Sequence, residues 1–154
     1  MLLFVNLTIN CNVMYELIYV SSAIKKLNEE ELNSILVQSR QYNIAHSITG
    51  ILLYIDGDFL QVLEGKKENI DCLFDKIRRD KRHQGIIVVY EGNKVKRDFP
   101  DWAMGFRSTN YETLRDLSGF EELNKRDLFN IEDKTAVSFL KTFIMTHSHK
   151  VTFW

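Results

Sequence analysis

Proline is almost absent from this sequence, in which Pro100 is the only one among 154 residues. No low-complexity linker and no internal repeat interrupts the chain, whose length suits one domain. With 45% hydrophobic and 27% charged residues, the composition is that of a globular protein with a substantial core. We therefore expect a folded unit without long flexible connections.

Cysteine is also scarce, because the chain contains only Cys11 and Cys72. The two residues have neither the spacing of metal ligands nor that of a disulfide framework. Cys72 lies in a helical pattern and is expected to be a small core residue. This usage suits a reducing compartment, so we expect a cytoplasmic protein.

The net charge is −1, so neither sign is in surplus. The charge pattern therefore predicts no nucleic-acid partner and no anionic membrane partner. The apolar start of the chain lacks a basic flank and is too short to span a bilayer. We interpret residues 1–14 as an N-terminal extension and Met14 as a plausible natural start.

Motifs of common enzyme classes are missing. The sequence has no Gly-rich phosphate loop and no signature around a serine or cysteine nucleophile. His147 and His149 lie near the C-terminus and are expected to be solvated rather than to bind a metal. We expect no metal site and no catalytic residue.

Hydrophobic periodicity predicts the order of strands and helices. Strands are expected at residues 15–21, 48–55, 58–63, 85–90 and 103–106, and helices at 28–43 and 67–79. Asn28 and Glu31 form a predicted capping box, and Asp56-Gly57 is a strong hairpin signal. The order is a ferredoxin-like β-α-β-β-α-β arrangement with an extra strand, an α+β fold with both helices on one face of an antiparallel sheet.

The C-terminal residues 108–154 are predicted to be helical, with helices at 111–117, 121–128 and 131–145. In the last of these, an apolar stripe is formed by Ala136, Phe139, Leu140 and Phe143. The second face of the sheet needs a cover, and we expect these C-terminal helices to provide it.

A glutamine occupies a position where a core residue is expected. Gln61 shares one face of its predicted strand with Phe59 and Leu63. A buried amide without partners costs about 1–3 kcal/mol. Tyr19 on the first strand and Asn43 on the first helix are similar anomalies. Either each pairs locally with backbone, or all three converge on one ligand, and the pattern alone leaves both interpretations open.

A polar group, Asp80-Lys81-Arg82-His83, directly follows the second helix. One interpretation is a solvated helix end whose charges suit the helix dipole. The other is a set of hydrogen-bonding groups for the polar edge of a ligand.

These residues together resemble the BLUF family, blue-light sensors that use FAD. The resemblance covers about residues 15–107. The matching positions are Leu17 to Ser21, Ser39, Arg40, Asn43, Ile48 to Gly50, Phe59 to Gly65, Asp80, Arg82, His83, Arg97, Phe99, Trp102 and Met104.

The resemblance implies a non-covalent FAD, with FMN or riboflavin as substitutes, and roles for single residues. Tyr19 would give an electron and a proton to the excited flavin, and Gln61 would bridge Tyr19 and the ring. Asn43 would bind the carbonyl edge, while Trp102 and Met104 would flank Gln61. The other expected flavin contacts are Ile35, Ser39, Arg40, Thr49, Phe59, Leu63, Ile77, Asp80, Arg82 and His83.

The resemblance also implies a sensor rather than an enzyme. Residues 15–107 would form the flavin-binding domain and residues 108–154 the output region. The signal would pass along the strand of Trp102 and Met104 to the C-terminal helices, and then to an unidentified signalling protein or within a homo-oligomer. Two other classes stay open, a flavin-binding redox enzyme and a ligand-free interaction module of the same fold.

Overall fold

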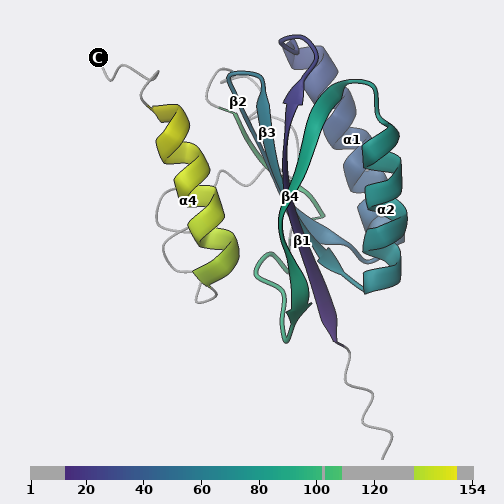
Figure 1. Ribbon diagram of the computed structural model, residues 1–154. Coiled ribbons are helices and arrows are strands. Elements are labelled where there is room, and N and C mark those ends of the chain that lie inside the picture. Colours follow the sequence, from purple (N-terminus) through teal and green to yellow (C-terminus); the bar gives the residue numbers. More distant parts are fainter. Residues whose placement is uncertain (1–12, 102, 109–133, 149–154) are drawn as a thin grey trace, which may run out of the picture.

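The protein is a three-layered α+β structure, seen in a computed structural model that describes residues 13–101, 103–108 and 134–148. Its elements are β1 (Met14–Ala23), α1 (Glu29–Ala45), β2 (Thr49–Ile55), β3 (Asp58–Gly65), α2 (Lys67–Arg79), β4 (His83–Lys94), β5 (Gly105–Ser108) and α4 (Lys134–Ser148). The strands form one sheet in the order β4-β1-β3-β2-β5. Helices α1 and α2 lie on one face and α4 on the other (Figure 1). The predicted ferredoxin-like arrangement is confirmed.

Strand β5 differs from its prediction in both position and direction. It begins at Gly105 and pairs parallel with β2, with Gly105 opposite Ile51. The chain leaves β4 at one edge of the sheet and reaches the other edge in the direction of β2, so the pairing is parallel rather than antiparallel. Met104 consequently lies immediately before the strand and not within it.

Local signals set the other boundaries. Asn28 caps α1 through the predicted capping box, in which its side chain accepts from the Glu31 amide and Glu31 reaches back to the Asn28 amide. Strand β4 continues to Lys94, beyond its predicted end at residue 90. Its last residues lie at the edge of the sheet, where Glu91 and Asn93 are exposed to solvent while the Lys94 side chain is nearly inaccessible.

The sheet separates two apolar cores, because side chains alternate along each strand. The helix-side core lies under α1 and α2 and includes Tyr19, Leu63 and Phe74. The α4-side core includes Val62 of β3 and Phe99 of the connection between β4 and β5. The predicted stripe of α4 packs there, with Ala136, Leu140 and Phe143 buried and Phe139 partly buried.

Two predictions about single residues are wrong. Cys72 is exposed, because the buried face of α2 carries Ile70 and Phe74 while Cys72 points away from it. His147 is not simply solvated, since its Nε2 lies 3.1 Å from Asp58 Oδ2. The predicted helices at 111–117 and 121–128, and His149, lie outside the described residues. Within the described part of the chain, no helix is long and apolar enough to cross a membrane.

Candidate functional site

A cavity of about 240 Å³ lies between α1, α2 and the sheet. Its walls come from both helices, from β1, β2 and β3, and from the turn that joins α2 to β4. The lining residues are Tyr19, Ile35, Gln38, Ser39, Tyr42, Asn43, Leu52, Phe59, Gln61, Leu73, Lys76, Ile77, Asp80, Arg82 and His83. Apolar walls with a few converging polar groups are typical of a small-molecule site.

Tyr19 and Gln61 form a buried hydrogen-bonded pair at the sheet wall of this cavity. They lie opposite each other on β1 and β3, and the Tyr19 hydroxyl donates to Gln61 Oε1 at 2.6 Å. Burial raises the pKa of Tyr19 above its ordinary value, and the nearby charge of Asp80 raises it further. The phenol therefore keeps its proton at physiological pH and donates it in the hydrogen bond to Gln61.

The other end of the Gln61 amide faces Met104. Gln61 Nε2 donates to Met104 Sδ at 3.5 Å, and sulfur is a weak acceptor. Met104 is buried in the helix-side core, although it precedes β5. Gln61 therefore links β1 to the chain segment that leads into β5. Trp102, the other residue predicted to flank Gln61, lies outside the described residues.

Asn43 contributes an unpaired acceptor. Its side chain is fully buried, and Nδ2 donates to the Ala103 carbonyl at 2.6 Å. Its Oδ1 is buried without a partner within the described part of the chain. An orphaned buried acceptor costs about 1–3 kcal/mol, so a ligand N–H at this position would be stabilising.

The polar end of the cavity is formed by residues that follow α2. Asp80 ends that helix and binds Arg82 with an N–O distance of 2.5 Å. Burial alone would raise the pKa of Asp80, but the hydrogen bonds from Arg82 outweigh it and the pKa lies below its ordinary value. His83 Nε2 donates to the Ile77 carbonyl at 2.7 Å, and its Nδ1 lies within hydrogen-bond distance of the Ser21 hydroxyl at 2.8 Å. The group serves both as the helix end and as cavity wall.

Three residues predicted to contact the flavin do not line the cavity. Thr49 lies on the opposite face of β2, where its hydroxyl lies 3.3 Å from Glu64 Oε2 and accepts from Arg97. Arg40 donates from Nε to the Met104 carbonyl. Leu63 shares the face of Gln61 but packs in the helix-side core. The other predicted contacts, Ile35, Ser39, Phe59, Ile77, Asp80, Arg82 and His83, line it together with Tyr19, Asn43 and Gln61.

Sequence reasoning missed five lining residues, Gln38, Tyr42, Leu52, Leu73 and Lys76. Helical spacing is the signal that finds Gln38, Tyr42 and Leu73, since they lie three, four or seven residues from Ile35 or Ile77 on the same helix, and Lys76 follows Leu73 by three. Lys76 additionally places its ammonium 4.4 Å from the centre of the Tyr42 ring. Leu52 lies opposite Gln61 in the β2–β3 register and is found by that pairing alone.

Comparisons with known proteins agree with this fold. The family described as "BLUF: Sensors of blue-light using FAD" matches residues 14–105. The photoactivated adenylate cyclase subunit beta of Euglena longa is 36% identical over 89 residues, which are 57% of this chain and 10% of that protein. Subunit alpha of Euglena gracilis is 40% identical over 74 residues, or 48% of this chain and 7% of that protein.

Solved structures show the same fold. BlrB, a BLUF protein in its dark state, is 29% identical with a TM-score of 0.64, covering 88% of this chain and 98% of that one. A bacterial light-regulated adenylyl cyclase is 34% identical with a TM-score of 0.62, covering 90% of this chain and 35% of that one. The chain belongs to the BLUF family of blue-light sensors. It spans about a tenth of the length of the curated relatives that it matches.

Proposed function

We propose that this chain is a blue-light photoreceptor that binds FAD non-covalently in the cavity between α1 and α2, with FMN or riboflavin as substitutes. The observation that carries the proposal is the 2.6 Å hydrogen bond from Tyr19 to Gln61 in the cavity wall. The unpaired Oδ1 of Asn43 fits a flavin, whose ring carries an N–H between two carbonyls. When bound, the flavin absorbs blue light and accepts an electron and a proton.

Tyr19 is the proposed donor of the electron and the proton. Its proton already points at Gln61 Oε1, so Gln61 is the group that relays it. A glutamine amide has donors at one end and acceptors at the other, and a rotation or a change of tautomer reverses this order. The reversal would change the contact between Gln61 and Met104 without moving the ring.

The remaining lining residues would hold and orient the ring. Ile35 on α1 and Ile77 on α2 would pack against its two faces. Asp80, Arg82 and His83 would face its polar outer edge. At about 240 Å³, the cavity is small beside the roughly 300–1,000 Å³ of drug-sized sites, which suits a ring inserted between the helices with its chain outside.

One spectrum tests the proposal. The purified protein should be yellow and release one FAD per chain on denaturation. Blue light should shift its flavin absorption slightly to the red, and the shift should decay in darkness. A colourless protein that takes up no flavin on reconstitution would contradict the photoreceptor assignment.

The same preparation separates the competing classes. A redox enzyme should show reduction of its flavin by NAD(P)H and steady turnover in darkness, and neither is expected here. A ligand-free interaction module would leave Asn43 Oδ1 unpaired and would bind no flavin. Bound flavin with a reversible light-induced shift and no dark turnover supports the sensor alone.

We further propose that the signal leaves through the segment before β5 and through α4, to a partner protein or a second copy of the chain. Residues 15–107 would then be the sensor and residues 108–154 the output region. Light should alter amide hydrogen exchange at residues 103–106 and in α4, since Met104 contacts Gln61 directly. Identical exchange there in dark and light, with the spectral shift intact, would mean that the signal takes another route.

A further inference from the structure

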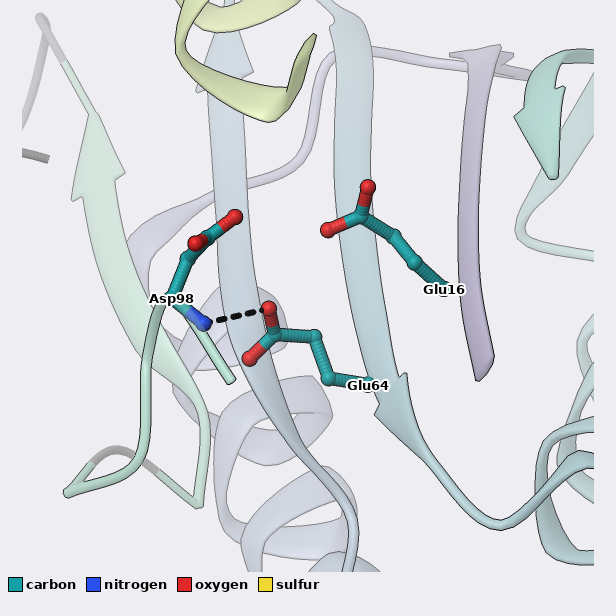
Figure 2. A group of neighbouring side chains, drawn as sticks. All are labelled: Glu16, Glu64 and Asp98. Carbon is teal, nitrogen blue, oxygen red and sulfur yellow. Dashed lines mark hydrogen bonds between the residues drawn. The ribbon is translucent and has the colours of Figure 1, made fainter. Parts of the chain in front are cut away.

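A buried group of charged side chains lies outside the cavity. Glu16 of β1, Glu64 of β3 and Asp98 of the β4–β5 connection have carboxylate oxygens within 4.8 Å of one another (Figure 2). Lys94 Nζ donates to Glu16 Oε2 at 2.6 Å and to Asp98 Oδ2 at 2.6 Å. It also donates to Glu64 Oε1 at 2.8 Å. The Lys94 ammonium thus takes the place that a metal cation would need, and the group is an ion cluster rather than a metal site.

The cluster lies on the face of the sheet opposite the cavity. Glu16 and Glu64 are cross-strand partners, and each alternates with residues that face the helices. Buried charges of this kind are retained in folded proteins only when they are paired and hydrogen-bonded. All side chains of the cluster are nearly inaccessible, with Glu64 at 0% exposure.

Glu64 also holds backbone. Its Oε1 accepts from the Asp98 amide at 2.7 Å (Figure 2). Its Oε2 accepts from the Phe99 amide at 3.0 Å. Arg97 adds a second attachment, because its guanidinium donates to the Glu64 carbonyl at 2.7 Å and to the Ser47 carbonyl. The start of the 98–104 segment is therefore fastened to the ends of β2 and β3.

The end of the same segment meets the proposed photoactive residues. Ala103 supplies the carbonyl that accepts from Asn43, and Met104 supplies the sulfur that accepts from Gln61. Phe99 is buried in the α4-side core, whereas Met104 is buried in the helix-side core. Phe99 thus lies on the α4 side of the sheet and is held by Glu64, while Met104 lies on the helix side and contacts Gln61.

We propose that Glu64, with its carboxylate held by Lys94, is a positioning residue for the Gln61 switch. It fixes the 98–104 segment and so sets the lifetime of the light state. This inference rests on the proposed photoreceptor function. It assigns Glu64 and Lys94 no contact with flavin, and both act through the segment that carries Met104.

The charge of Glu16 affects how strongly Lys94 holds Glu64. Burial raises the pKa of Glu16 to about 7, Glu64 and Asp98 add to the rise, and Lys94 opposes it. The groups that face Glu16 are Glu64 from β3, Lys94 from β4 and Asp98 from the connection. When Glu16 ionises near neutral pH, it competes more strongly with Glu64 for the Lys94 ammonium. The dark recovery rate should therefore change across about pH 7.

The test measures dark recovery against pH in the flavin-loaded protein. Glu64→Gln should keep flavin and the red shift but recover faster by about three- to tenfold, the range for one weakened charged hydrogen bond. Glu16→Gln, which mimics the protonated form, should recover at the low-pH rate of the parent at every pH. Asp71→Asn, which breaks only the exposed pair with Lys67, should leave the pH profile unchanged.

Three outcomes overturn the inference: a parental recovery rate in Glu64→Gln, a parental pH profile in Glu16→Gln, or an altered profile in Asp71→Asn. A second readout needs no flavin. Amide exchange at Asp98, Phe99 and Met104 should be faster in Glu64→Gln than in the parent, and equal exchange contradicts the positioning role. If the parent binds no flavin or shows no shift, the proposed function fails, while the exchange experiment still decides whether Glu64 holds the segment.

Discussion

Gln61→Leu is expected to abolish the light-induced red shift while leaving the flavin bound. Leucine keeps the approximate volume of the side chain but can neither accept from Tyr19 nor donate to Met104, which are the two contacts of the amide. The proposed contacts of the ring with Ile35, Ile77 and Asn43 are untouched by this change, so the flavin content should change little. A light-minus-dark difference spectrum at equal flavin content measures the effect.

The same experiment has a matched control in the same cavity. Gln38 also lines the cavity, and its contact is with Arg82 at 3.4 Å rather than with Tyr19. Gln38→Leu should therefore keep the shift. Tyr19→Phe should lose it, because phenylalanine keeps the packing against Phe74 but has no proton to give. A normal photocycle in Gln61→Leu would contradict the hydrogen-bond switch.

Lys94→Met should destabilise the protein by about 3–5 kcal/mol at pH 8, the usual cost of removing one partner from a buried ion pair. Burial alone would lower the pKa of Lys94, but its hydrogen bonds to the carboxylates outweigh it and the pKa lies above its ordinary value. The ammonium is thus charged at every pH in the experiment. Its loss leaves three buried carboxylates without their cation. Urea unfolding measures the effect.

The loss of stability in Lys94→Met should be larger at high pH than at low pH. Burial raises the pKa of Glu16 from its ordinary 4.5 to about 7, so the folded state keeps this proton to higher pH than the unfolded chain. Between these values the folded state binds more protons, and the contribution of Glu16 to the free energy of unfolding falls as pH rises.

Without Lys94 the pKa of Glu16 should rise further, so Lys94→Met should lose less stability at pH 5 than at pH 8. Lys67→Met is the control, since it removes an exposed pair worth less than about 1 kcal/mol. An equal loss at both pH values would argue against the charge assignment.

The fold was predictable because its signals are local. The capping box at Asn28, the hairpin at Asp56-Gly57 and the periodicity of α2 each depend on residues close in sequence. The direction of β5 was not predictable in this way. Its pairing with β2 depends on the course of the ten-residue connection between β4 and β5, and no local sequence pattern encodes that course.

The site was predictable where a polar side chain interrupts an apolar face. Gln61, Tyr19 and Asn43 were found by this signal, and the structure brings all three to one cavity. Thr49 was misplaced because motif resemblance does not say which face of a strand a side chain takes. Glu16 and Lys94 were missed, although the alternation along β1 places Glu16 on an inward face, between apolar neighbours that should have marked it.

Strand β3 contributes one residue to the cavity, Gln61, and one to the buried ion cluster, Glu64. Gln61 and Leu63 belong to the compartment under the helices, and Val62 and Glu64 to the compartment under α4. A shift of the register by one residue would exchange these two sets together, placing the glutamine amide among the ions and the glutamate in the cavity. A chimera that takes this strand from another BLUF protein must therefore keep the number of residues before it. A junction that is one residue short would turn the glutamine toward α4 and the glutamate toward the cavity.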